Sequence, residues 1–156
     1  MKREGGCICG AVRYELLEEP LFVQACHCTH CQTATGSAFI MTMILEAHNF
    51  KIQKKGAMNT YTMQLGSGER ADGHFCGTCN AGLWGNPQGQ TEGIVFIRAG
   101  TLDNTKHIAP SAHIYTKSKQ EWVVLPEGVP CFEESYVQAE VWPEESLERI
   151  QKLYGI

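Results

Sequence analysis

Short stretches of apolar, aromatic and β-branched residues recur along the chain, separated by glycine or proline residues. Stretches of this kind favour β-strands over helices, which need longer periodic runs. The pattern predicts strands at Ala11–Leu17, Leu21–Ala25, Ala38–Leu45, Phe50–Gln53, Thr60–Leu65, Gly82–Trp84, Ile94–Gly100, His113–Thr116 and Val123–Leu125. Turn signals such as Gly66-Ser67-Gly68 separate neighbouring stretches, so we expect a mainly β, mostly antiparallel fold.

The C-terminal segment has a pattern that is typical of a helix. Pro143 suits a first helical turn, and Glu144 and Glu145 complement the positive end of the helix dipole. Apolar side chains then recur on one face before Gly155, at Leu147, Ile150, Leu153 and Tyr154. We therefore expect one short C-terminal helix near Pro143–Tyr154, packed on the sheet, and no other helix.

The 156 residues of the chain predict a single domain over residues 1–156. The formal net charge is −4, which argues against binding to nucleic acid or to an anionic membrane surface. The longest nearly unbroken apolar run, Phe39–Leu45, is too short to cross a bilayer. The first residues do not resemble a secretory signal. We therefore expect a cytoplasmic protein with no nucleic-acid or membrane partner.

Seven of the eight cysteines fall into three short clusters, and Cys131 stands alone. The clusters are Cys7-Ile8-Cys9, Cys26-His27-Cys28-Thr29-His30-Cys31 and Cys76-Gly77-Thr78-Cys79. In a reducing compartment, clustered cysteines favour metal binding or catalysis over disulfides. A two-residue gap between cysteines lets the chain present both sulfurs to one zinc ion. We interpret Cys131 as a small, partly buried residue outside these clusters.

Seven thiolate ligands divide naturally into a closed set of four and an open set of three. Cys26, Cys28 and Cys31 can form a three-thiolate site from one local segment, which leaves the other two pairs for a four-thiolate site. In the alternative interpretation every cluster is structural, and His27 or His30 completes the second zinc site. A redox-active cysteine pair is disfavoured, because the chain lacks the βαβ pattern of a thioredoxin-like unit.

The cysteine clusters and their flanking residues resemble the glutathione-dependent formaldehyde-activating (GFA) family. The matching strings are Gly6-Cys7-Ile8-Cys9-Gly10-Ala11-Val12-Arg13-Tyr14, then Cys26-His27-Cys28-Thr29-His30-Cys31 with Gly36 and Phe39, then Phe75-Cys76-Gly77-Thr78-Cys79. Segments Ile97–Asp103 and Ala112–Trp122 resemble the carboxyl half of the family. The resemblance is strongest over residues 5–125.

The resemblance implies a β-tent, a folded-sheet architecture that binds two zinc ions. It implies a structural zinc bound by Cys7, Cys9, Cys76 and Cys79, and a catalytic zinc bound by Cys26, Cys28 and Cys31. The family joins glutathione to formaldehyde to give S-hydroxymethylglutathione, and the reverse reaction is that of a carbon–sulfur lyase. The chain departs from many members after its second CxxC, where it has Asn80 instead of glycine and a glycine only at Gly82.

Elementary chemistry agrees with a carbon–sulfur reaction at the second site. Three thiolates and one Zn²⁺ carry a formal charge of −1, so this ion is poorly suited to activating water. Its open position suits a substrate thiolate or an aldehyde oxygen. His27 and His30 flank this site and could move a proton or hydrogen-bond a zinc-bound sulfur, but a residue between two ligands usually points away from the metal, and we expect this of both. Cations that could bind the carboxylates of glutathione, most of them expected on the surface, are Lys51, Lys54, Arg98, Lys117 and Lys119.

Two functions remain open on the sequence alone. The first is a zinc-dependent carbon–sulfur lyase that adds glutathione or a related thiol to formaldehyde or another small aldehyde. The alternative is a non-catalytic, zinc-stabilised binding module of the same fold. The three-cysteine cluster favours the enzyme, because a scaffold needs no metal ion with an open position.

Overall fold

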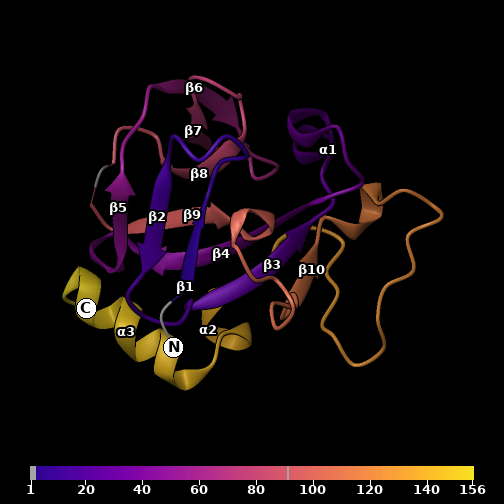
Figure 1. Cartoon of the computed structure of the whole chain (residues 1–156). Helices are drawn as coiled ribbons and strands as arrows, with labels where there is room; N and C mark the ends of the chain where they lie inside the picture. Colours follow the sequence, from indigo (N-terminus) through magenta and orange to yellow (C-terminus); the bar gives the residue numbers. More distant parts are fainter. Residues whose placement is uncertain (1–2, 91) are drawn as a thin grey trace.

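The computed structural model describes residues 3–90 and 92–156, and its strands form two sheets (Figure 1). The smaller sheet has the order β1-β2-β5 and consists of β1 (Arg3–Gly6), β2 (Arg13–Leu16) and β5 (Phe50–Lys54). The larger sheet has the order β10-β3-β4-β9-β8-β7-β6 and consists of β3 (Phe22–Cys26), β4 (Ile40–Glu46), β6 (Met58–Gln64), β7 (Arg70–Cys76), β8 (Gly82–Pro87), β9 (Ile94–Arg98) and β10 (Ala112–Ile114). Among the described strands only the β10–β3 pair is parallel, so the prediction of a mainly β, mostly antiparallel fold is confirmed.

The main hydrophobic core lies between the two sheets. Tyr14 and Leu16 of β2 pack in one cluster with Met43 of β4 and Ile97 of β9, and all four side chains are fully buried. Successive side chains of a strand point to opposite faces, so the alternate residues of β4 and β9 face away from this core. That second face of the larger sheet, here called the outer face, carries the C-terminal helix at one end and the candidate site at the other.

The C-terminal helix α3 (Glu144–Tyr154) and the short helix α2 (Gln138–Val141) cover part of the outer face (Figure 1). Ile150 and Trp142 pack against Phe22, whose ring stacks on the Trp142 ring with centroids 5.4 Å apart. Arg149 donates hydrogen bonds of 2.8 and 2.6 Å to the two carboxylate oxygens of the buried Glu46. The predicted C-terminal helix is therefore confirmed, and an ion pair joins it to β4.

The expectation of a single helix is wrong, because α1 (Thr29–Thr35) and α2 are also helical. Helix α1 buries none of its residues, so it has no apolar stripe that a sequence pattern could reveal. Its ends define it instead. Cys28 is the N-cap and accepts a hydrogen bond from the backbone N–H of Cys31, and Gly36 ends the helix in the left-handed conformation with φ 63°.

Two strands were not expected, and one expected strand does not form. β1 and β7 contain glycines and polar residues, which hide the alternation of apolar and polar positions. Val123–Leu125 lies in an irregular segment that follows a turn at Glu121 and Trp122. Three short 3₁₀ turns lie at Ala47–Asn49, Ala99–Thr101 and Thr116–Ser118. Across the described residues, no helix has the length and apolar character needed to span a bilayer.

Candidate functional site

The structure brings the first and third cysteine clusters together. Cys7 and Cys9 lie in the turn after β1, Cys76 ends β7, and Cys79 lies in the turn before β8. The four sulfurs lie within 4.8 Å of one another, with separations of 3.6 Å between Cys7 and Cys9 and 3.7 Å between Cys9 and Cys76. A tetrahedral zinc ion with bonds of about 2.3 Å would hold its sulfurs about 3.8 Å apart. This four-cysteine cluster therefore fits a closed metal site.

The backbone around the four-cysteine cluster supports ionised sulfurs. The N–H groups of Val12 and Thr78 point at Cys7 and Cys76, at 3.2 and 3.4 Å. The backbone N–H of Ala81 helps to lower the pKa of Cys79 to about 6. The neighbouring thiols oppose further ionisation and raise the pKa of Cys9 to about 11, although the Ala11 N–H lowers it. Such mutual repulsion is relieved when a cation binds all the thiolates.

Asn80 completes the tight turn beside this cluster. It has φ 57°, in the left-handed region that asparagine tolerates better than most residues. Its N–H donates to the Cys76 carbonyl at 2.9 Å. Asn80 therefore takes the conformation that a glycine would adopt at this position, and the departure from the family pattern leaves the turn intact.

The second cluster is built where β3 meets α1. Cys26 ends β3, Cys28 is the N-cap of α1, and Cys31 lies in the helix one turn further on. Their three sulfurs lie within 4.8 Å of one another. The Cys31 thiol lowers the pKa of Cys26 to about 7. In turn, the Cys26 sulfur and burial raise the pKa of Cys31. The three thiols thus do not ionise together without a cation, and their geometry fits a three-ligand metal site.

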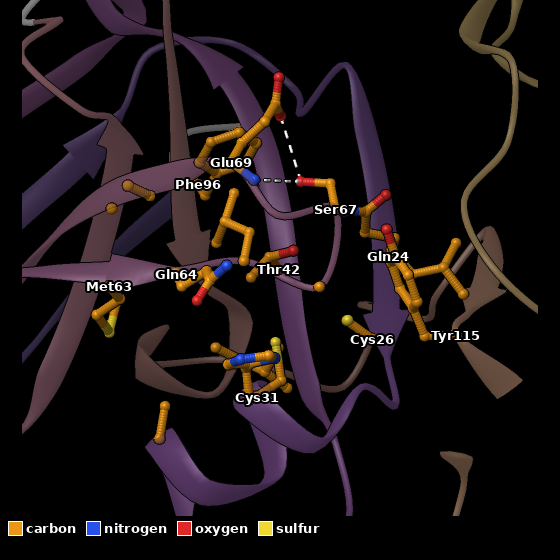
Figure 2. Close-up of a pocket in the computed structure, with 18 of the residues that line it drawn as sticks. Gln24, Cys26, Cys31, Thr42, Met63, Gln64, Ser67, Glu69, Phe96 and Tyr115 are labelled. Atoms are coloured by element: carbon orange, nitrogen blue, oxygen red, sulfur yellow. Dashed lines mark hydrogen bonds between the residues drawn. The ribbon is translucent and has the colours of Figure 1, made fainter. Parts of the chain in front are cut away.

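The two clusters differ in what lies beside them. Cys26 and Cys31 line a cavity of about 640 Å³ on the outer face, whereas no residue of the four-cysteine cluster does so. Figure 2 shows the sulfurs of Cys26 and Cys31 directed toward each other at one end of this cavity. Its volume lies within the range of small-molecule pockets. A fourth ligand could therefore reach the second cluster from the cavity.

Strands, α1 and a hairpin enclose the cavity. The strands contribute alternate residues of the outer face, among them Gln24, Ile40, Thr42, Phe96 and Arg98. The hairpin between β6 and β7 contributes residues from Met63 to Glu69. The hairpin closely approaches the second cluster: a Cβ at Gly66 would lie 3.0 Å from Cβ and 3.1 Å from Sγ of Cys28. Substitution of Gly66 would therefore disturb the cysteines directly.

The histidines of the second cluster are not metal-ligand candidates in this geometry. His27 is fully buried, and its Nε2 lies 2.9 Å from Nδ1 of the buried His113. Burial lowers the pKa of His27 to about 4, which keeps the ring neutral. His30 is exposed and lines the cavity. Within the described residues neither ring joins the three sulfurs as a ligand group, so the three-cysteine, one-histidine alternative lacks support.

Of the five candidate cations, Arg98 alone lines the cavity. Lys51 and Lys117 pair instead with Glu15 and Glu134. Lys54 and Lys119 lie outside the cavity lining. The sequence does not reveal that Gln24, Thr42 and the hairpin line the cavity, because their placement depends on strand register and not on a local motif.

The interpretation of Cys131 as partly buried is wrong, because its side chain is exposed. The segment that carries it runs along the edge strand β10, where Cys131 and His113 form an isolated parallel bridge. Its thiol donates to the Val129 carbonyl at 3.2 Å. Cys131 thus belongs to neither cysteine cluster, as the sequence indicated.

Comparison with known proteins identifies the family of the chain. The family profile described as "Glutathione-dependent formaldehyde-activating enzyme" matches residues 2–118. The chain belongs to this family. A curated protein of Halomonas elongata, named "Putative glutathione-dependent formaldehyde-activating enzyme", is 27% identical over 129 residues, which cover 80% of this chain and 82% of the relative. A crystal structure of a Rhodobacter sphaeroides protein aligns with a TM-score of 0.46 and 21% identity, covering 69% of this chain and 91% of that one.

Proposed function

We propose that this GFA-family protein is a zinc-dependent carbon–sulfur lyase of the S-(hydroxymethyl)glutathione synthase type. It adds glutathione or a related small thiol to formaldehyde or another small aldehyde. The observation that carries this proposal is the three-cysteine cluster beside a cavity large enough for a tripeptide thiol. Family membership and the name of the Halomonas elongata relative support the same chemistry.

The two clusters have different roles in this proposal. Cys7, Cys9, Cys76 and Cys79 hold a structural zinc, because four converging sulfurs leave no position for a substrate. Cys26, Cys28 and Cys31 hold the catalytic zinc, because three sulfurs leave one position open toward the cavity. When bound there, zinc supplies a Lewis acid for a thiol sulfur or an aldehyde oxygen.

The protein contributes mainly by holding two small reactants together. The cavity walls are predominantly side chains of strands and of α1, which restrict the positions of thiol and aldehyde. Fixing two reactants in this way removes several kcal/mol of the entropic barrier to their combination. The addition forms one C–S bond, and the thiol proton is transferred to the aldehyde oxygen.

The choice of thiol agrees with the setting of the chain. All eight cysteines are free, which suits a reducing compartment such as the cytoplasm, where glutathione is abundant. The cavity lining is largely apolar, but it also bears one arginine, one glutamate and several amide or hydroxyl groups that can bind the polar groups of a peptide thiol. We propose no nucleic-acid or membrane partner, since the formal net charge of −4 opposes both.

The proposal is tested by proton NMR of glutathione mixed with formaldehyde, with and without the zinc-loaded protein. The signal of S-hydroxymethylglutathione should appear, or exchange with free glutathione, faster than in the spontaneous reaction. Cys28→Ser is the matched control, because serine also caps a helix and preserves the fold around α1. A wild-type rate equal to the spontaneous rate would leave the non-catalytic binding module as the better account.

A further inference from the structure

Three polar side chains form a row across the cavity floor. Strand pairing places Gln24 opposite Thr42, and Thr42 opposite Arg98, on the adjacent strands β3, β4 and β9. All three residues line the cavity, and Figure 2 shows Gln24 and Thr42 on the same side of Cys31 as Cys26. Cys26 is the next residue after Gln24 on the same face of β3. The polar row therefore runs directly beside the second cysteine cluster.

Two neighbouring residues, Phe75 and Gly82, accommodate the guanidinium of Arg98. It lies over the Phe75 ring, 5.1 Å from the centroid. Gly82 of β8 leaves room for it, because a Cβ at that position would lie 2.1 Å from Nη1 of Arg98. The glycine that this chain has at Gly82 thus admits the arginine side chain to the cavity.

Arg98 differs from the other partly buried arginines in having no carboxylate partner. Arg3, Arg13 and Arg149 pair with Glu19, Asp103 and Glu46. Among the residues that the structure describes, no carboxylate pairs with Arg98. Burial lowers the pKa of Arg98, but an arginine remains charged at neutral pH. A partly buried charge without a counter-ion is unfavourable unless a ligand supplies one.

Gln24 is oriented so that its amide N–H groups remain available. Its Oε1 accepts a hydrogen bond from the Tyr136 hydroxyl at 2.8 Å, and that hydroxyl in turn accepts from Nε1 of Trp142 at 2.9 Å. The hydrogen bond from Tyr136 thereby fixes the orientation of the Gln24 amide, with Oε1 toward the hydroxyl. The row then offers an amide, a hydroxyl and a guanidinium, and all three can donate to one anionic group.

We propose that Arg98, with Gln24 and Thr42, binds a carboxylate of the thiol substrate and makes the cavity selective for anionic thiols. This inference rests on the proposed function, and it names the substrate class of the same site. Arginine forms two parallel hydrogen bonds with a carboxylate, which adds geometric selectivity to the charge attraction. Strand β3, which carries Cys26, and strand β9, which carries Arg98, lie two strand spacings apart, about 10 Å. A short peptide thiol can span this distance, with its sulfur at the cysteines and its carboxylate at Arg98.

Arg98 could also act by balancing the negative charge of the three cysteines and their metal ion. Three thiolates with one Zn²⁺ carry a formal charge of −1, and this charge would repel an anionic thiol. Arg98 lines the same cavity as Cys31, so its positive charge can offset this repulsion. An arginine that served only the cysteines would affect charged and neutral thiols alike. An arginine that binds the substrate carboxylate affects charged thiols alone.

Binding measurements separate these two roles. Glutathione, glutathione diethyl ester and 2-mercaptoethanol are titrated, without aldehyde, into zinc-loaded wild type, Arg98→Met and Arg70→Met. Arg70 is an exposed arginine on β7 and serves as the control for loss of one positive charge. Arg98→Met should weaken glutathione binding at least about tenfold, as expected for a lost charged hydrogen-bond pair. Binding of the diester and of 2-mercaptoethanol should change less than about twofold, and Arg70→Met should match wild type.

Equal weakening for all three thiols would overturn the inference, as would no weakening or no binding of glutathione by wild type. If Arg98→Met fails to fold, the wild type alone decides: glutathione must bind at least about tenfold more tightly than its diester. The result is independent of catalysis. Arg98-dependent binding without aldehyde turnover would contradict the proposed function and leave the carboxylate site standing.

Discussion

Loss of a ligand should affect folding very differently at the two cysteine clusters. The four-cysteine cluster joins segments that are far apart, since Cys9 and Cys76 are separated by 67 positions. The second cluster lies within one segment from Cys26 to Cys31. We therefore expect Cys79→Ser to destabilise the whole fold and Cys28→Ser to leave it nearly intact.

The magnitude follows from loop-closure entropy. The cost of closing a loop grows as about (3/2)RT ln n, so a metal that closes the long loop restrains the unfolded chain by about 2 kcal/mol more than one that closes the short loop. For a chain of this size, that difference corresponds to roughly 4–8 °C in Tm. Cys28→Ser is further protected, because Cys28 caps α1 through a hydrogen bond from Cys31 N–H that a serine oxygen can also accept.

The assay compares thermal unfolding and zinc content of both variants, prepared with zinc and a phosphine reductant. Each variant should lose about one zinc ion per chain, but Cys79→Ser should have the lower Tm by several degrees. An equal or larger loss of Tm in Cys28→Ser would refute the reasoning and indicate that the second site is structural. Full aldehyde turnover by Cys28→Ser would remove the metal from the proposed reaction.

Three other predictions test separate parts of the account. Glu46→Gln should lower the free energy of unfolding by roughly 3 kcal/mol at neutral pH, because it breaks a buried ion pair with Arg149. Burial alone would raise the pKa of Glu46, but Arg149 lowers it below its usual value in the folded protein. The difference in unfolding free energy between wild type and Glu46→Gln should therefore be complete above about pH 4.5 and should shrink as the pH falls further, which urea unfolding measures. Gly82→Ala should displace the Arg98 guanidinium and weaken glutathione binding, whereas Gly100→Ala should not, because nothing lies within 4 Å of its added Cβ. Equal glutathione affinities of the two variants in calorimetric titration would contradict this prediction. Duplex DNA should bind no more tightly than micromolar at physiological salt, because the chain is acidic, and a salt-sensitive submicromolar complex in fluorescence anisotropy would show the charge argument to be wrong.

The ligand clusters could be foreseen because their chemistry is local. CxC and CxxC spacings bring two sulfurs close together whatever the rest of the chain does, and counting the cysteines suggested the division into four and three. The structure agrees with that division, since it gathers the same four and the same three sulfurs. The C-terminal helix was equally visible, because its apolar face is periodic over three turns.

The cavity could not be foreseen, because it depends on contacts between distant segments. The row of Gln24, Thr42 and Arg98 exists only in the register of three strands from different parts of the chain. The hairpin over the cavity depends on β7, whose glycine and polar residues concealed it. Helix α1 was missed for a related reason: it carries Cys31 and is capped by Cys28, but it buries none of its residues. Elements that serve a site instead of the core leave little hydrophobic signal.

X-ray absorption at the zinc edge tests the central claim most directly, namely that the chain holds one closed four-cysteine metal site and one three-cysteine site open to the cavity. The sample is wild-type protein loaded with zinc and kept reduced without any added thiol. The account predicts two zinc ions per chain with an average of about 3.5 sulfur neighbours each and a remaining nitrogen or oxygen neighbour. One zinc ion per chain, or four sulfurs around every zinc, would contradict it.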